Sequence, residues 1–176
     1  NMAAMYAVYH GPEGITAIAR RVHAMTRALD KALRSLGFEQ TNTSYFDTLR
    51  IVSTADRVRK VRHDAEAAGY NFRYIGETGI GISLDETATV EDLVAILGVF
   101  AGAASKTGAV ALDADRGPPA WPAHLVRTTP ILTHPIFNSH RSESEMMRYI
   151  RSLERKDVGL DTSMIPLGSC TMKLNR

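Results

Sequence analysis

The segment Gly168 to Asn175, GSCTMKLN, places two hydroxyls, a thiol, an amine and an amide within eight residues. So many reactive groups in one short stretch are typical of a segment that lines a site. The consecutive backbone amides of Gly168 to Cys170, with the hydroxyls of Ser169 and Thr171, could bind a carboxylate or a phosphate as an anion-binding nest. The alternative is an ordinary polar loop.

The remaining side chains of this segment are binding candidates with simpler alternatives. Cys170 could be a thiolate activated by Lys173, but a small buried hydrophobe is favoured because free cysteine is commonly buried. Lys173 could pair with an anionic substrate or cofactor, whereas an exposed lysine is the usual case. Asn175 completes the set of candidates.

His140 is the one histidine with a possible binding role, because it lies beside Ser139 just before a predicted helix start and could approach a cofactor. A polar residue at a helix start often serves only as a cap. The six histidines show no metal-ligand spacing supported by acidic or thiol partners, so no metal site is predicted. The glycines of GETGIGI, Gly76 to Ile82, suggest a turn and a strand rather than a phosphate loop, because no helix start follows them.

Composition limits the classes of protein that the chain can belong to. Its 176 residues are 44% hydrophobic and carry a net charge of +2, which indicates a globular protein without a nucleic-acid or membrane surface. No stretch is long enough to span a bilayer. The single cysteine excludes an internal disulfide and fits a reducing compartment.

Helical periodicity predicts the elements that precede the candidate segment. The chain opens in good helix formers without an initiator methionine, so we expect it to begin inside a helix. Gly11, Pro12 and Gly14 break that helix. Apolar residues three or four apart then predict a long helix from Ile15 to Leu36, with Gly37 as its stop.

Residues 44 to 101 predict a small α/β sandwich in the order β-α-β-β-α. The pattern indicates strands over Tyr45–Ser53, Asn71–Ile75 and Gly79–Leu84, and a helix over Thr54–Ala68. Thr89 and Asp92 predict the capped start of a second helix. Its expected core residues are Leu93, Val94, Leu97 and Phe100.

Five of the seven prolines lie between Gly102 and His140, which predicts an ordered linker on another surface rather than regular structure. Trp121 within it indicates docking. Ser142 and Glu145 then predict the start of a helix to about Lys156, with Met146, Ile150 and Leu153 as its apolar stripe.

Four stretches resemble the P-protein of the glycine cleavage system, the glycine dehydrogenase (decarboxylating) family. They are NMAAMYAVYHGPEG near the start, SYFDTL at Ser44 to Leu49, HPIFNSHRSESEMMRYIRSLERKD at His134 to Asp157, and SMIPLGSCTMKLN at Ser163 to Asn175. The last stretch is the most specific. The resemblance touches the whole chain and is least distinctive between Gly69 and Ala120.

The resemblance implies a section of a pyridoxal-phosphate fold type I enzyme built from two fused halves, each with a large and a small domain. Residues 1–43 would be helices leaving the large domain of the first half, and 44–102 its small α/β domain, of the α+β type. Residues 103–140 would be the Pro-rich linker between the halves. Residues 141–176 would start the second half with a helix and an active-site arm.

The implied chemistry is glycine decarboxylation with pyridoxal phosphate, which takes up the electrons released as CO2 leaves. The aminomethyl group passes to the lipoyl arm of the H-protein, so the enzyme is an oxidoreductase acting on CH–NH2 with a disulfide acceptor. The T- and L-proteins and a second copy in a homodimer are the other implied partners. The implied compartment is the cytoplasm for a bacterial source, which is favoured, or the mitochondrial matrix for a eukaryotic one.

The family's Schiff-base lysine stands in a His-Lys pair, which this sequence lacks, so no catalytic residue is assigned and the isolated chain is expected to be inactive. Two alternatives stay open. One is another fold type I pyridoxal-phosphate enzyme, which sequence beyond this chain would distinguish. The other is a non-catalytic regulatory module of residues 44 to 101 that binds a small ligand.

Overall fold

A computed structural model describes residues 1–106, 121–159 and 161–162 of the chain. The chain divides into two units. One unit is Thr16–Thr128, and the other combines Asn1–Ile15 with Thr129–Arg176.

Helix α1, Met2–Ser35, is interrupted at Gly11, whose backbone has φ 62° and ψ −176°. Pro12 follows at the start of the second helical stretch, so the predicted break is confirmed. At the other end Gly37 adopts φ +83°, and the Phe38 amide donates to the Leu33 carbonyl at 3.1 Å. The predicted stop at Gly37 is therefore confirmed as a left-handed helix terminus.

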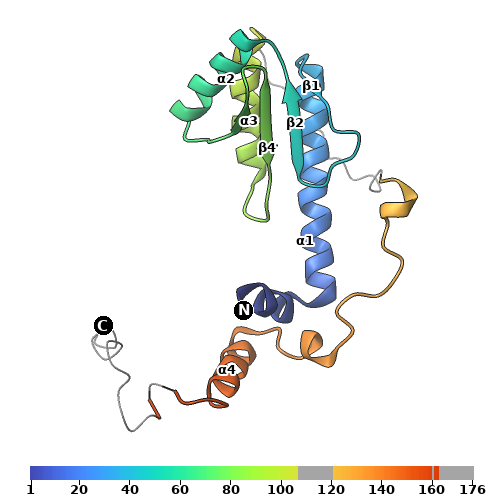
Figure 1. Cartoon of the computed structure of the whole chain (residues 1–176), viewed down its shortest axis with the longest axis vertical. Helices are drawn as coiled ribbons and strands as arrows, with labels where there is room; N and C mark the ends of the chain where they lie inside the picture. The colour runs from blue at the N-terminus through green and yellow to red at the C-terminus, as the bar shows by residue number, and fades with distance from the viewer. Residues whose placement is uncertain (107–120, 160, 163–176) are drawn as a thin grey trace. The chain divides into compact units, whose positions relative to one another are not determined.

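The larger unit contains a four-stranded antiparallel sheet in the order β1-β2-β4-β3. Its strands are β1 Glu39–Gln40, β2 Thr48–Val52, β3 Arg73–Ile75 and β4 Gly79–Ser83. Alternate residues of the two central strands are buried, namely Leu49, Ile51, Ile80 and Ile82. One face of the sheet therefore faces the core, and in Figure 1 β2 and β4 lie in front of α1 and α3.

Three strand predictions need correction. The strand expected from Tyr45 begins at Thr48. Tyr45 and Phe46 do not pair with a neighbouring strand, because they pack around Trp121 instead. The strand expected from Asn71 begins at Arg73. The two-residue strand β1 was not predicted, because so short a strand has no periodicity of its own and exists through its pairing with Ile51 and Val52.

Two capped helices complete the core. Helix α2, Ala55–Ala67, starts at Thr54, and α3, Val90–Ala103, starts with the predicted capping box of Thr89 and Asp92. The core stripe of α3 is Leu93, Ile96, Leu97 and Phe100. Val94 was expected to face the core but is 54% exposed, because it lies about 100° around the helix from this i, i+3, i+4, i+7 stripe.

Helices α1, α2 and α3 and the sheet share one hydrophobic cluster. At its centre the rings of Phe38 and Phe100 meet edge to face, with their centroids 4.9 Å apart. Leu29 and Leu33 of α1 are fully buried beside them. Each such side chain stabilises the fold by about 1.5–3 kcal/mol relative to exposure. This cluster therefore holds the three helices and the sheet together.

The smaller unit contains the 3-10 helix η2, Pro135–Asn138, and helix α4, Glu143–Glu154. Ser142 caps α4 as predicted, since its Oγ accepts from the Glu145 amide at 3.3 Å. The helix ends two residues before the expected Lys156. Its stripe of Met146, Ile150 and Leu153 is not buried, and Ile150 is 44% exposed.

Helix length and hydropathy decide whether a helix can cross a bilayer. No helix among residues 1–106, 121–159 and 161–162 combines the length and the apolar character that a membrane crossing requires.

Candidate functional site

Most of the predicted binding residues lie outside the described part of the chain. They are Gly168, Ser169, Cys170, Thr171, Lys173 and Asn175. His140 is the predicted site residue that the structure describes, and it belongs to the smaller unit.

His140 lies between η2 and α4 in a turn fixed by local hydrogen bonds. Its ring stacks on Tyr149 of α4, with centroids 4.4 Å apart and planes at 11°. Before it, Ser139 Oγ donates to the Pro135 carbonyl at 2.7 Å; after it, Ser142 caps α4. The half-buried imidazole therefore has one face covered by Tyr149 and its orientation set by the turn.

Arg141 brings a cation to the same turn. Its Nη2 donates to Asn138 Oδ1 at 2.7 Å, and its Nη1 lies 3.8 Å from Glu13 Oε2. Sequence reasoning missed both Arg141 and Asn138 as candidates. A signal was present in NSHR, Asn138 to Arg141, where an amide, a hydroxyl, an imidazole and a guanidinium stand side by side.

The carboxylate at the start of α4 is held in its charged form. The hydrogen bond from the Ser142 hydroxyl, followed by one from the Ser142 backbone, lowers the pKa of Glu145 below its ordinary value. The anion also lies in the first turn of α4, where the helix dipole favours negative charge. This end of the turn is therefore acidic, whereas Arg141 is basic.

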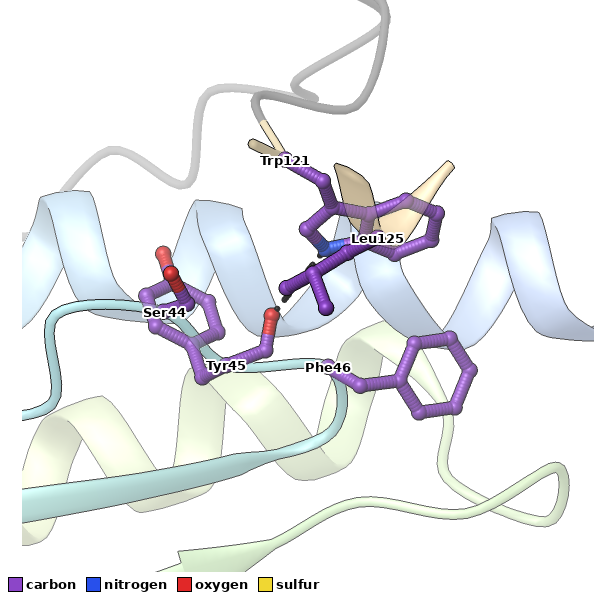
Figure 2. A pocket seen from close by; sticks show the side chains of 5 residues that line it. All are labelled: Ser44, Tyr45, Phe46, Trp121 and Leu125. Atoms are coloured by element: carbon purple, nitrogen blue, oxygen red, sulfur yellow. Dashed lines mark hydrogen bonds between the residues drawn. The ribbon is translucent and has the colours of Figure 1, made fainter. Parts of the chain in front are cut away.

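The larger unit contains an aromatic pocket of about 400 Å³ (Figure 2). Its lining residues are Ser44, Tyr45, Phe46, Trp121 and Leu125. Trp121 precedes η1, Ala123–Leu125, and its Nε1 donates to the Tyr45 carbonyl at 3.2 Å. The predicted docking of Trp121 is confirmed, and its indole and Leu125 lie across from the Ser44–Phe46 segment (Figure 2).

The side chain of His23 packs against the aromatic residues that line the pocket. His23 of α1 is 4% exposed, its ring lies parallel to that of Phe46 at 6.0 Å, and its centroid is 4.5 Å from that of Trp121. His23 Nδ1 lies 2.9 Å from the Phe46 carbonyl. The pocket is thus lined by the segment before β2 and the segment around η1, and His23 of α1 packs against two of its aromatic rings.

Tyr45 is anchored by a buried network on its other side. Its hydroxyl donates to Asp30 Oδ2 at 2.8 Å, and Arg34 Nε donates to Asp30 Oδ1 at 2.7 Å. Burial, followed by the hydrogen bond to Asp30, raises the pKa of Tyr45 well above its ordinary value. The hydrogen bond to Asp30 therefore fixes the position of the Tyr45 ring in the wall of the pocket.

A second, more polar depression of about 340 Å³ lies between β3, β4 and the start of α3. Tyr70, Arg73, Asp85 and Asp92 are among its lining residues. Its carboxylates serve the backbone: hydrogen bonds from Thr89 lower the pKa of Asp92, and hydrogen bonds from Thr87 lower the pKa of Asp85. These acids cap turns and a helix, so the depression is a structural feature.

Within the part of the chain that the structure describes, no three His, Cys, Asp or Glu side chains are grouped so that they could hold a metal ion. The described groups can bind and orient a ligand. The aromatic pocket suits an apolar group, and Arg141 can donate to an anion.

The fold and these sites define a class, a mixed α/β domain in which helices cover one face of an antiparallel sheet and a Pro-rich segment docks beside it. The family profile described as glycine cleavage system P-protein matches residues 1–100. The chain therefore belongs to the glycine cleavage system P-protein family, and its fold is consistent with a small domain of such an enzyme.

Curated relatives extend this similarity over the whole sequence. Proteins named glycine dehydrogenase (decarboxylating) from Stenotrophomonas maltophilia and Xanthomonas euvesicatoria are each 51% identical over 174 residues, 99% of this chain. One named glycine dehydrogenase (decarboxylating) 2, from Pseudomonas putida, is 47% identical over 175 residues. The chain spans 18% of the length of each of these relatives.

Proposed function

We propose that this chain is a section of a glycine dehydrogenase that decarboxylates glycine and transfers its aminomethyl group to the lipoyl arm of the H-protein. The observation that carries the proposal is the 51% identity over 99% of the chain to proteins named for this decarboxylation. The section is also far shorter than these relatives. The reaction thus belongs to the longer protein, an oxidoreductase acting on CH–NH2 with a disulfide acceptor.

Within that enzyme the chain supplies a small domain and an arm rather than the reacting lysine. Residues 44–102 form the small domain, 103–140 link the two halves, and the candidates Gly168 to Asn175, with His140, bind substrate or cofactor. The longer protein acts as a homodimer with the H-, T- and L-proteins. The named bacterial relatives support a bacterial cytoplasm as its location.

Pyridoxal phosphate is the cofactor of the proposed enzyme, and it supplies the electron sink for decarboxylation. Two of the described lysines make other contacts. Lys60 Nζ pairs with Asp64 at 2.9 Å on an exposed helix face, and Lys106 donates to the Ser35 carbonyl. Both ammonium groups are thus engaged by other groups of the chain, which supports a Schiff-base lysine outside this chain.

A chimera tests the proposal. The 174 matching residues of this chain would replace the corresponding section of the Stenotrophomonas maltophilia relative. CO2 release from carboxyl-labelled glycine would then be measured with pyridoxal phosphate and lipoylated H-protein. We expect a rate within about tenfold of the parent, which corresponds to a loss of transition-state stabilisation of at most about 1.4 kcal/mol. The matched control is the parent with the same section deleted. A folded chimera that binds the cofactor but releases no CO2 contradicts the proposal.

A further inference from the structure

Gly11 occupies a backbone conformation that other residues do not adopt. Its φ of 62° and ψ of −176° fall in a region that is essentially restricted to glycine, because a Cβ would meet its own backbone. The residue is buried within the YHGPEG stretch, whose break in α1 the proposed function does not explain. Besides this backbone conformation, a second feature of the structure requires glycine at position 11.

The second reason is the close approach of the turn that carries His140. A Cβ built on Gly11 would lie 2.7 Å from Arg141 Nη2 and 2.8 Å from the Phe137 carbonyl oxygen. Both distances are shorter than real Cβ contacts, and one of the two neighbours is backbone that cannot rotate away. The guanidinium therefore fills the space that any side chain at position 11 would need.

Two side chains contact the Arg141 guanidinium in this position. Its Nη2 donates to Asn138 Oδ1 at 2.7 Å, and its Nη1 faces Glu13, two residues after Gly11, at 3.8 Å. The adjacent His140 stacks on Tyr149. The position of one guanidinium thus links the kink of α1 to the imidazole and to the start of α4.

We propose that Gly11 is a positioning residue, whose missing side chain seats the Arg141 guanidinium and thereby sets the orientation of the His140 ring on Tyr149. The inference rests on the proposed function only for the part that His140 takes in binding. The contact itself needs neither glycine nor cofactor.

The test is nuclear magnetic resonance of the whole 176-residue chain without ligand. The stacked Tyr149 ring should shift the His140 ring protons upfield in the wild type, and a Tyr149→Leu variant defines the value without the stack. We expect Gly11→Ala to remove most of that shift. Gly37→Ala is the matched control, because Gly37 also has a positive φ but no atom lies within 4 Å of the position that its Cβ would take.

A double-mutant measurement distinguishes the contact between Gly11 and Arg141 from backbone strain at position 11. Gly11→Ala should speed hydrogen exchange of the Phe137 and Met146 amides, whose acceptors are His134 and Ser142. In an Arg141→Ala background the same change should have a smaller effect, because only the Phe137 carbonyl then remains close to the new Cβ. Arg141→Lys, which keeps the charge but loses the fork, should reproduce part of the loss.

Three results would overturn the proposal: a wild-type His140 without the upfield shift, a Gly11→Ala chain that keeps it, or additive effects of Gly11→Ala and Arg141→Ala. Unchanged exchange at β4 reports that the larger unit has stayed folded. The glycine assay of the chimera is independent of these measurements, so failure of one inference is distinguishable from failure of the other.

Discussion

Trp121 illustrates how a single side chain can hold a Pro-rich segment in place. Its indole covers His23 and Phe46, and its Nε1 hydrogen bond reaches the Tyr45 carbonyl. A residue of this size brings both apolar area and one directional bond. The two contributions can be separated by substitution.

We predict that Trp121→Phe lowers the free energy of unfolding by about 1 kcal/mol, because it removes the hydrogen bond but keeps a ring. Trp121→Ala should cost about 2 kcal/mol or more, because the packing is also lost. Urea unfolding followed by circular dichroism measures both. Equal stability of the three chains would mean that the indole does not dock. In the wild type, iodide should quench this single tryptophan less than it quenches a free indole.

Tyr45 gives a prediction with a defined pH range. Its pKa is raised in the folded state by burial and by the hydrogen bond to Asp30, whereas an unfolded tyrosine titrates near about 10. The stabilisation is therefore complete below pH of about 10 and is lost as pH rises toward the folded pKa. The free energy of unfolding should fall more steeply above pH of about 10 in the wild type than in Tyr45→Phe. Parallel curves for the two chains would contradict this assignment.

At the scale of elements, the helix ends are the features that short stretches of sequence predict best. Thr89 Oγ1 accepts from the Asp92 amide at 3.2 Å, and Asp92 Oδ2 accepts from the Thr89 amide at 2.9 Å. We predict that Thr89→Ala lowers the free energy of unfolding by about 1 kcal/mol. Thermal unfolding measures this, with Thr87→Ala in the preceding turn as the control. A control that costs as much as Thr89→Ala would show that the cap has no special weight.

The same helix ends explain which parts of the fold could be predicted from the sequence. Thr54, Thr89 and Ser142 cap helices by bonds to residues three positions away, and Gly37 ends α1 with a bond that returns to Leu33. Such contacts are local, so the pattern of residue types contains them. The helices were therefore predicted to within two residues at the ends where a cap or a stop glycine stands.

What the sequence left out depends on contacts between distant residues. Strand β1 exists through pairing with β2, and the segment before β2 bends because Tyr45 bonds to Asp30 and to Trp121, 76 positions further on. Val94 was assigned to the core because apolar type alone does not fix which face of a helix is covered. The close approach of Arg141 to Gly11 likewise joins segments that are distant in the sequence.

For the molecule as a whole, the apolar stripe of α4 is informative. Ile150 is 44% exposed, Met146 and Leu153 are half-buried, and no described residue of α4 is buried. An amphipathic helix gains most of its stability by burying its apolar face. The apolar stripe of α4 therefore has no place in the hydrophobic core of the described residues.

The last prediction concerns the isolated chain and pyridoxal phosphate. A lysine that forms a stable imine with the cofactor usually has its amine activated by burial or by a second cation. The four described lysines, Lys31, Lys60, Lys106 and Lys156, are all exposed. We therefore expect borohydride reduction of the chain with pyridoxal phosphate to label its lysines weakly and without preference, as peptide mass spectrometry would measure.

The control for that labelling is the same chain unfolded in urea. Folded and unfolded chains should be labelled alike at each described lysine, and neither should release CO2 from glycine. One lysine labelled to one equivalent in the folded chain alone would show that a cofactor site is complete within these 176 residues. That result would contradict the proposal that the Schiff-base lysine belongs to another part of the enzyme, because a preformed imine site requires the pocket that activates its amine.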